Sequence, residues 1–564
     1  METWIRRTLI ILACLWMVCC VLLPVTQLLW KSFLSPEGEF SSLANYVAYF
    51  NNPALSASLT NSLYVSVLTT LISTLLGFAF AYALTRTCIP FKGLFQGIVM
   101  MPLFAPTLLN GIALVYLFGR KGLISQGFFG KLPGVPIELY GPFGIVFAEV
   151  LYTFPQAVLI LSVALRMTDA RLYEASESLG AGHFRTFLNI TLPGIKFGLI
   201  STFFVCFILA FTDFGAPKVV GGQFNVLATD IYKQVIGQQN FVMGAVVSSV
   251  LLVPTVIAFV ADRICQRRQF SALTARSVPL VPRPSGMRDI LAFTLCTVVA
   301  VCILGFYGTA LFASLVKVWP YDLSLGFGHY DFSRMGGGGI DSLANSIRMS
   351  LYSAALGTAT AFGSAYLIEK SRGMQTLRQI SYMLSLLPLA LPGMVIGLSY
   401  IFFFNAPSWS LFGWSVANPF NVLYGTMGIL VLSNVVHFYT VSFLTATTAL
   451  KQLDKEFETV SESLGVPFYR TFVRVTVPVC LPAALEIAVY YFVNSMATVS
   501  AVIFLYNADL PLASVAVANM DDAGDIAPAA AMAMLIVAIN ILVRGLYSLL
   551  NRWALRRTQN WAGR

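Results

Sequence analysis

Long apolar runs recur along the whole chain. A helix needs about 20 mostly apolar residues to cross the hydrocarbon core of a bilayer, and scanning the sequence at that length predicts twelve spans. This pattern is typical of an all-α integral membrane protein with about twelve transmembrane helices in two tandem groups of six. The predicted spans lie near residues 9–30, 60–85, 94–118, 143–165, 195–214, 241–261, 289–315, 346–368, 380–404, 424–447, 479–505 and 528–550.

The composition excludes a water-soluble globular protein. Hydrophobic residues make up 57% of the 564 residues, charged residues only 11%, and the mean hydropathy is +0.77. Soluble domains carry about 25% charged residues, and this chain has too few polar residues to cover the surface of domains of this total length.

The first apolar run, 9–30, follows Arg6 and Arg7 and so resembles a secretory signal. It is longer than a typical signal core and ends without a small-residue cleavage pattern. We therefore expect it to be an uncleaved first span.

The basic residues predict the orientation. If both termini are cytoplasmic, 26 of the 35 Lys and Arg residues fall in inside segments, as the positive-inside rule requires. The net charge of +10 then reflects topology, and no nucleic-acid partner is expected. The basic, proline-containing stretch 266–288 is interpreted as a cytoplasmic linker between a first module, 1–265, and a second, 289–564.

The chain has nine cysteines and three histidines. Most of the cysteines lie inside apolar runs, and the sequence contains no CxxC pair with a matching histidine cluster. We expect no disulfide framework, no metal site and no cofactor. No set of nucleophile, base and metal ligands recurs at a plausible depth, so no catalytic residues are expected.

The two halves repeat each other. The pentapeptide SESLG occurs at 176–180 and again at 461–465, and in the same register the tripeptide RTF occurs at 185–187 and again at 470–472. Ordered matches across several spans and loops indicate duplicated modules. Because each module has an even number of spans, both enter the membrane in the same sense, and a transport path is expected at their interface.

The inside loops after the fourth and tenth spans are amphipathic. The first loop predicts a short helix, a break at Gly180 and a second short helix ended by Pro193. Such a helix cannot bury its apolar stripe alone. It either packs beneath its own membrane helices as a simple connector or docks on a partner protein.

The first loop reads E-A-S-x-x-L-G, then nine residues, then I-x-L-P, and this resembles the EAA loop of permease subunits in binding-protein-dependent ABC importers. The second copy departs from the pattern at Thr459 and Val460 and keeps Glu462, Gly465 and Pro478. The resemblance implies two coupling loops, 166–193 and 451–478, that insert into ATPase subunits. The coupling residues it implies are Glu174, Ala175, Gly180, Glu462 and Gly465.

The sequence contains no G-x-x-x-x-G-K-[ST] phosphate loop. The resemblance therefore implies a transport channel subunit and no enzyme, with ATP hydrolysis on a separate ABC subunit, in two copies. It also implies a periplasmic substrate-binding protein as a partner. The location that it implies is the bacterial inner membrane, with N and C termini in the cytoplasm.

Ionisable side chains at membrane depth are costly and mark candidate functional sites. Glu149 and Glu486 lie inside spans, and Asp213 lies near the outer end of another. The alignment of the two repeats pairs Glu149 with Asn434, and these four residues form the candidate translocation path. The alternative is that the glutamates only bond neighbouring helices and that Asp213 caps a helix. His437 is interpreted as a hydrogen-bonded packing residue.

Two proline pairs interrupt the third and ninth spans at matching places: Pro102 with Pro106, and Pro388 with Pro392. Broken helices at corresponding positions of two halves often mark a transport path. Kinks tolerated for packing would give the same pattern.

Fused permeases of this type resemble a group that carries iron(III), thiamine, polyamines or 2-aminoethylphosphonate. Segments 319–332 and 495–507 look most like the members assigned to 2-aminoethylphosphonate, with iron(III) as the alternative. A twelve-span, ion-coupled secondary transporter is a further possibility. That class would show coupling carboxylates near the midplane and would not need two matched inside loops.

Overall fold

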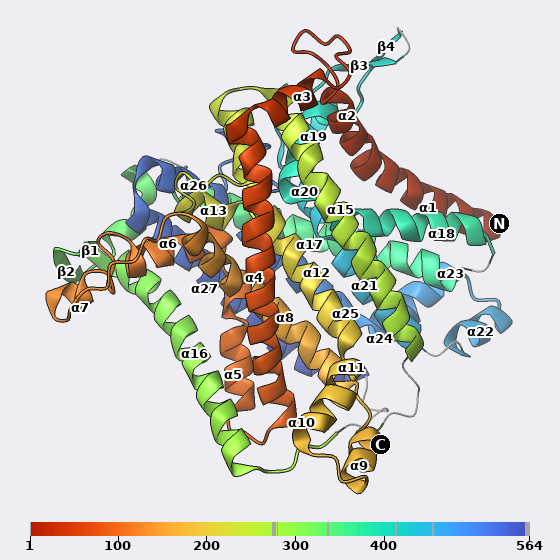
Figure 1. Ribbon diagram of the computed structural model, residues 1–564. Coiled ribbons are helices and arrows are strands. Elements are labelled where there is room, and N and C mark those ends of the chain that lie inside the picture. The colour runs from red at the N-terminus through yellow and green to blue at the C-terminus, as the bar shows by residue number, and fades with distance from the viewer. Residues whose placement is uncertain are drawn as a thin grey trace.

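The computed structural model describes residues 2–272, 278, 280–334, 338–371, 373–411, 414–453 and 456–558, and these form helices almost throughout (Figure 1). The helices of the first half are α1 (Glu2–Met17), α2 (Leu23–Lys31), α3 (Ala44–Asn51), α4 (Pro53–Arg86), α5 (Lys92–Val99), α6 (Thr107–Phe118), α7 (Gly127–Gly130), α8 (Pro142–Arg166), α9 (Ala170–Ser178), α10 (His183–Thr186), α11 (Leu192–Gly194), α12 (Lys196–Thr212), α13 (Gly215–Val220), α14 (Leu227–Tyr232) and α15 (Phe241–Ala272). The helices of the second half are α16 (Gly286–Leu315), α17 (Gly339–Lys370), α18 (Gln375–Leu386), α19 (Gly393–Phe404), α20 (Met427–His437), α21 (Tyr439–Gln452), α22 (Glu456–Ser463), α23 (Phe468–Thr471), α24 (Val477–Val479), α25 (Leu481–Ala497), α26 (Ala513–Ala523) and α27 (Ile526–Thr558).

Short irregular turns and two hairpins complete the described chain. The π-helical turns are η1 (Val18–Leu22), η3 (Phe187–Thr191), η4 (Lys233–Gly237) and η9 (Phe472–Thr476). The 3-10 turns are η2 (Met101–Phe104), η5 (Gly328–Tyr330), η6 (Phe332–Arg334), η7 (Leu387–Ala390) and η8 (Asn421–Leu423). The strands are β1 (Val316–Val318), β2 (Asp322–Leu325), β3 (Ser408–Leu411) and β4 (Trp414–Ala417), and β1 pairs antiparallel with β2 as β3 does with β4.

Eleven of the twelve predicted spans are apolar enough to cross a membrane. In the described residues, six helices qualify directly, and five pairs of helices bent by more than 40° qualify when each pair counts as one span. The twelfth is α17, which has 32 residues and is therefore long enough. Its buried face carries small polar residues, which lower its hydropathy but let neighbouring helices approach closely. Thus a Cβ at Gly357 would lie 2.5 Å from the ring of Tyr491 on α25.

The predicted proline interruptions are confirmed in both halves. The segment 92–104 meets α6 at 104°, and the segment 375–390 meets α19 at 111°. In each case the second residue of a 3-10 turn is a proline, and another proline stands just before the following helix. Proline has no N–H to continue the helical hydrogen bonds, so both spans break at the same level.

The internal repeat is visible in matching hydrogen bonds. The backbone N–H of Leu227 donates to the Ser62 hydroxyl at 2.8 Å, and the N–H of Ala513 donates to the Ser346 hydroxyl at the same distance. Ser346 is the counterpart of Ser62 in the repeat that the sequence predicts. Each half thus holds the start of a short helix, α14 or α26, against its own long helix in the same way.

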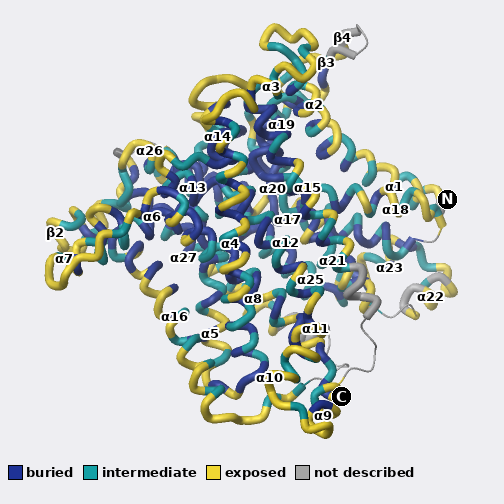
Figure 2. The backbone as a smooth tube through the Cα atoms, in the orientation of Figure 1, coloured by how far each residue is buried: buried dark blue, intermediate teal, exposed yellow. Residues whose placement is uncertain are grey.

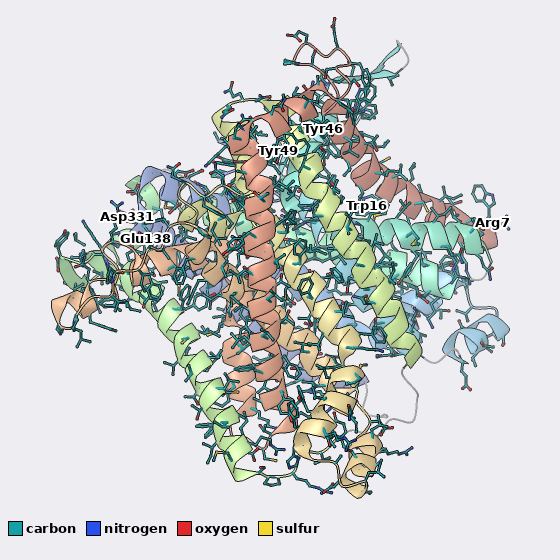
Figure 3. All side chains as sticks on the ribbon, viewed as in Figure 1. Arg7, Trp16, Tyr46, Tyr49, Glu138 and Asp331 are labelled. Carbon is teal, nitrogen blue, oxygen red and sulfur yellow. The ribbon has the colours of Figure 1, made fainter. Side chains whose placement is uncertain are left out.

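The first helix of each half packs against the other half. The α1–α2 segment contacts α18 and α19, whereas α16 contacts α4, α5 and α6. The Tyr400 hydroxyl on α19 donates to the Cys20 carbonyl at 2.8 Å, and the Tyr307 hydroxyl on α16 donates to Asn110 Oδ1 at 2.8 Å. The ring of Trp16, labelled in Figure 3, lies 5.5 Å from that of Tyr439. These exchanged helices lock the two halves together.

Buried residues gather in the centre of the bundle, and exposed ones cover the outer sides of the peripheral helices (Figure 2). On α1, α15, α16 and α27 many of these exposed side chains are large and apolar, as a lipid-facing surface requires. Examples are Ile11, Leu12, Leu15, Val253, Ile257, Val298, Val301, Leu542 and Leu546.

The loops predicted to lie inside share one face of the molecule, which we call the inner face. It carries α9, α22 and the N-terminal end of α1 (Figure 1). The backbone N–H of Ala170 in the first loop donates to Val278 O in the linker at 2.9 Å, and Arg6 of the N-terminal helix lies over the ring of Phe468 in the second loop. Glu138 and Asp331, from loops predicted outside, lie on the opposite side of the molecule from Arg7 (Figure 3).

The exchanged helix can be tested by cross-linking. Cys14 Sγ on α1 lies 2.7 Å from Ser381 Oγ on α18. We expect Ser381→Cys to form a disulfide with Cys14 under mild oxidation, because the two side chains are already in contact. When a protease site between α15 and α16 is then cut, the halves should migrate together on a non-reducing gel. Ser381→Ala is the control, and separation of the oxidised Ser381→Cys halves would contradict the packing.

Candidate functional site

The two inner-face loops have the predicted form. In the first, the Asp169 side chain caps α9 by accepting from the Arg171 N–H at 3.1 Å, as an N-cap carboxylate commonly does. The helix ends before Gly180, whose φ of +71° is left-handed, and α10 follows. In the second loop, Gly465 has a φ of +66° between α22 and α23. Glycine adopts this conformation without steric cost, so the predicted break at Gly180 is confirmed, and Gly465 forms the same break in the second loop.

The second loop keeps the shape of the first despite its departures in sequence. The Ala181 N–H donates to Ser176 O, and the Val466 N–H donates to Ser461 O, both at 3.0 Å. The hydroxyls of Ser176 and Thr186 are 2.8 Å apart, and Ser461 and Thr471 are hydrogen-bonded in the same way. Both loops then continue through a π-helical turn, η3 or η9.

Four of the five coupling residues lie at exposed positions: Glu174, Ala175, Gly180 and Gly465. Glu462 belongs to α22, but its side chain lies outside the described part of the structure. The apolar side chains of these loops are exposed as well. Leu179 is 86% exposed and its counterpart Leu464 74%, and the same holds at two further repeat positions. These further pairs are Phe184 with Tyr469 and Leu188 with Val473.

Arg86 connects the first loop to the membrane helices, although the sequence showed it only as a topological charge. Its buried guanidinium donates to Leu165 O at 2.7 Å and to the Thr168 hydroxyl, at the ends of α4 and α8. It also lies over the ring of Tyr173 on α9, 5.1 Å from the centroid. The Tyr173 hydroxyl is 3.0 Å from that of Thr191. A movement of α9 would therefore be transmitted to two spans.

The structure brings together two of the four candidate path residues. Glu149 on α8 is fully buried, and no N–H or hydroxyl of the described chain donates to its carboxyl, which is hydrogen-bonded to the side chain of Asp213. Its charged neighbour is Asp213, at the break between α12 and α13. Asp213 Oδ2 accepts from the Ala216 N–H at 2.9 Å, so Asp213 also caps α13, as the alternative interpretation expected.

The other two candidate path residues, Glu486 and Asn434, contact different neighbours. Glu486 Oε1 accepts from Arg544 Nη1 at 2.9 Å, and this pair is about two-fifths exposed, so Glu486 bonds a neighbouring helix. Asn434 is buried and donates to Met349 Sδ at 3.3 Å. The His437 ring packs against Phe438, as expected of a packing residue. Its Nδ1, however, has no hydrogen-bond partner among the described residues, so the expected hydrogen bond is not made by that atom.

Two tyrosines that the sequence did not single out extend the carboxylate pair. Tyr152 follows Glu149 by one helical turn, and its phenol lies within electrostatic range of Glu149, Asp213 and Tyr490. Tyr490 belongs to α25 of the second half. The cluster of Glu149, Asp213, Tyr152 and Tyr490, which we call the carboxylate–tyrosine cluster, therefore joins side chains from both halves. A tyrosine inside an apolar run gives no sequence signal that separates this role from packing.

A cross-half ion pair lies on the outer face. Lys218 on α13 bonds Asp522 on α26, with 8% and 52% of the respective side chains exposed, and Lys218 Nζ lies 5.4 Å from the Tyr232 ring centroid. Burial, with the negative charge of Asp522, raises the pKa of neighbouring Asp521 to about 6, although Lys218 opposes the shift. The pair ties the two halves together on the side opposite the coupling loops.

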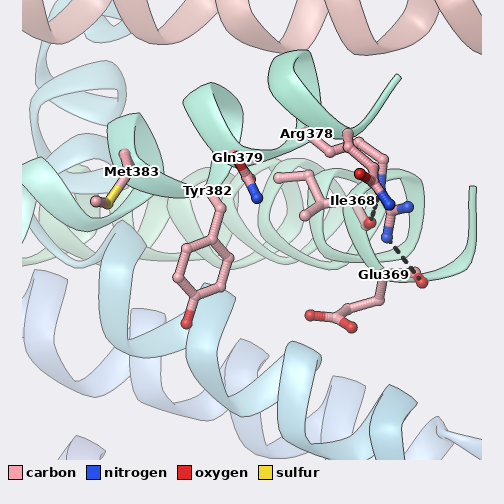
Figure 4. A pocket seen from close by; sticks show the side chains of 7 residues that line it. Ile368, Glu369, Arg378, Gln379, Tyr382 and Met383 are labelled. Carbon is pink, nitrogen blue, oxygen red and sulfur yellow. Dashed lines mark hydrogen bonds between the residues drawn. The ribbon is translucent and has the colours of Figure 1, made fainter. Parts of the chain in front are cut away.

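A surface hollow of about 520 Å³ lies between the end of α17 and α18 (Figure 4). Arg378 Nε donates to Ile368 O at 2.5 Å, and its Nη2 donates to Glu369 O at 3.4 Å. A cation there satisfies the last carbonyls of α17. None of its lining residues belongs to the carboxylate–tyrosine cluster, so we assign this hollow a structural role.

Comparison with known families accounts for this architecture. The profile of the family described as "Binding-protein-dependent transport system inner membrane component" matches residues 73–271 and 357–556. The chain belongs to this family. One match falls in each half, so the protein is a fused, two-half permease subunit of an ABC importer.

Individual relatives are similar over most of the chain. The ferric transport system permease protein FbpB of Actinobacillus pleuropneumoniae is 28% identical over 90% of this chain and 73% of its own length. A protein of Haemophilus influenzae described as putative ferric transport system permease protein FbpB 1 is 29% identical over 80% and 70%. The molybdenum permease ModB of Escherichia coli is 34% identical over 28% of this chain and 67% of its own length.

The outer ion pair can be tested by a double-mutant cycle with Lys218→Met and Asp522→Asn. The ammonium is mostly buried, so we expect a coupling energy of about 1 kcal/mol in thermal unfolding, declining with added salt. The matched control is the pair of Arg283 and Glu177 on the inner face, whose side chains are 78% and 69% exposed. Its coupling should be about 0.5 kcal/mol or less. A coupling near zero at Lys218 and Asp522 would contradict their role in joining the halves.

Proposed function

We propose that this permease imports iron(III) delivered by a periplasmic binding protein. The supporting observation is that two relatives named as ferric permeases align with 90% and 80% of the chain. The expectation of 2-aminoethylphosphonate gains no support from the comparisons. The alternative drawn from the sequence, iron(III), is the better supported of the two.

The charge of the candidate path also favours a cation. Glu149 and Asp213 place two carboxyl groups side by side in the interior of the bundle. Two carboxylates attract a metal cation through its whole charge, whereas 2-aminoethylphosphonate offers them one ammonium group and an anionic phosphonate that they repel. In a low-dielectric interior this difference is large, because charges interact far more strongly there than in water.

Two ATPase subunits, supplied by a separate protein, are proposed to bind α9 and α22. Each loop presents exposed apolar side chains at the same three positions of the repeat. A connector packed beneath its own helices would bury them, whereas a partner groove would cover them. Exposure of Glu174, Ala175, Gly180 and Gly465 fits their proposed coupling role, and Glu462 is proposed to share it.

The remaining organisation follows from this proposal. The binding protein docks on the outer face, and both termini and both coupling loops face the cytoplasm, in a bacterial inner membrane. The modules are 1–265 and 289–564, with 266–288 as the linker. ATPase closure would move α9 and α22 together and so switch the halves between inward and outward access, with different contacts in each state. An ion-coupled carrier would have no need of the two loops, and the family assignment replaces that alternative.

Coupling can be tested through the backbone at Gly180. A Cβ there meets no atom within 4 Å, so Gly180→Ala acts only through the left-handed φ, at about 1–2 kcal/mol. We expect Gly180→Ala with Gly465→Ala to weaken co-purification with the ATPase. Gly182→Ala is the matched control, because Gly182 has equal space but an ordinary φ of −67°. Equal ATPase binding by the double variant and the control would refute this docking.

The substrate can be tested in proteoliposomes that contain the permease, its ATPase and its binding protein. We expect ATP-dependent uptake of radioactive iron(III), because the path presents carboxylates to a cation. Radiolabelled 2-aminoethylphosphonate, with the same complex, is the comparison. Uptake of the phosphonate without uptake of iron would show the substrate assignment to be wrong.

A further inference from the structure

The Glu149 carboxyl is unusual among the acidic groups of the described chain. The Glu486 carboxylate is hydrogen-bonded to Arg544, and the Asp522 carboxylate forms an ion pair with Lys218. Glu149 is completely buried, no N–H or hydroxyl of the described chain donates to either of its oxygens, and its hydrogen-bond partner is another carboxyl, that of Asp213. A carboxylate at membrane depth costs about 2.5–3.5 kcal/mol on insertion scales, and a purely structural one would be expected to have a donor.

The repeat supplies an internal comparison. Asn434 occupies the equivalent position in the second half, is equally buried and bonds Met349. Its Oδ1 also lacks a hydrogen-bond partner among the described residues, so the two positions differ in that Asn434 is a neutral amide and Glu149 is an ionisable carboxyl. The ionisable carboxyl of the first half is therefore not required by the fold that the two halves share.

The other members of the carboxylate–tyrosine cluster add oxygen atoms from both halves. Asp213 is held at the helix break by the Ala216 N–H and by the Thr107 hydroxyl on α6. Tyr152 and Tyr490 are each partly exposed, whereas Glu149 is not, so the phenols are the more accessible members. Since α8 and α25 belong to different halves, relative movement of the halves would change the spacing of these oxygens.

We propose that Glu149, Asp213, Tyr152 and Tyr490 form a transient binding site for the cation cargo on its path between the two halves. This inference rests on the proposed function. Carboxylate and phenol oxygens are hard donors, which suit a small, highly charged cation. No group of three or more His, Cys, Asp or Glu side chains suited to a metal occurs in the described chain. The site therefore has two carboxylates with phenols, and such an incomplete ligand set favours release.

Binding is a ligand exchange without redox chemistry. Oxygens of the protein replace water or carrier ligands on iron(III). Each phenol that coordinates, and the hydrogen-bonded carboxyl pair, loses its proton to water, and the metal keeps its oxidation state. Relative movement of the halves would change the spacing of the oxygens on α8 and α25 and so release the ion.

The first test is transport by the complete complex in proteoliposomes. We expect Glu149→Gln and Asp213→Asn to lower iron uptake by about tenfold or more, as loss of a metal-binding group does. ATP hydrolysis stimulated by the loaded binding protein should stay within about twofold of wild type, because neither residue belongs to the coupling loops. A twofold change in rate corresponds to about 0.4 kcal/mol in activation free energy. Glu486→Gln, which removes a carboxyl bound to Arg544, is the matched control and should transport normally.

The second test is spectroscopic and does not depend on turnover. Iron(III) nitrilotriacetate added to the permease–ATPase complex should give a visible phenolate-to-iron(III) charge-transfer band. Tyr152→Phe and Tyr490→Phe should each weaken the band, and Tyr491→Phe should not, because the Tyr491 hydroxyl bonds Val435 O at 3.2 Å. Gallium(III) nitrilotriacetate, which has no such transition, serves as the blank.

The outcomes separate this inference from the proposed function. If wild-type complex takes up no iron, the substrate assignment fails and the site fails with it. If wild type transports iron and Glu149→Gln and Asp213→Asn match it, only the binding site is overturned. Loss of uptake in equal proportion to loss of stimulated ATP hydrolysis would indicate damaged coupling and would also overturn the site.

Discussion

The absence of water inside a bilayer is the constraint on which this structure depends. Polar groups in the bundle must find partners within the protein, because lipid offers none. The exchanged first helices satisfy this requirement across the halves: Tyr307 bonds Asn110, and Tyr400 bonds the Cys20 carbonyl. Several buried hydroxyls and the Asn434 Oδ1 have no partner in the described chain, but Glu149 is the buried acidic group to which no N–H or hydroxyl donates at either oxygen. This is why we propose the cation site there.

The two halves share one fold because they are duplicated, and residue differences between them make the candidate path asymmetric. The coupling loops keep the same turns, the same serine–threonine bonds and the same exposed apolar positions. Two copies of an ATPase subunit, as proposed above, would need two equivalent docking loops, which accounts for the shape that the loops share. The interior has no such requirement, and there Glu149 has an ionisable carboxyl where its repeat counterpart, Asn434, has a neutral amide. The two loops thus remained alike while this buried position diverged.

The sequence predicted much of this fold but little of the contact network. Apolar length predicted the spans, proline predicted the two sharp bends, and glycine predicted the break at Gly180, because each of these is a local property of the backbone. Apolar periodicity shows that a helix faces lipid or protein without showing which helix it faces, so the exchange of α1 and α16 was not predictable. Nor was the bond between Lys218 and Asp522, which lie far apart in the chain. Glu149 and Asp213 were found by their charge, whereas Tyr152 and Tyr490 became visible only through their position.

The central claim is that two like-oriented halves hold both coupling loops on the cytoplasmic side. Leu179 and Leu464 are its most direct reporters, since both are highly exposed and stand at equivalent tips of the two repeats. The measurement is labelling of Leu179→Cys and Leu464→Cys by a membrane-impermeant thiol reagent, in a variant without the native cysteines and without the ATPase. In this account both sites react in inside-out vesicles and neither reacts in right-side-out vesicles. Reaction of the two sites from opposite sides would contradict the parallel arrangement of the halves.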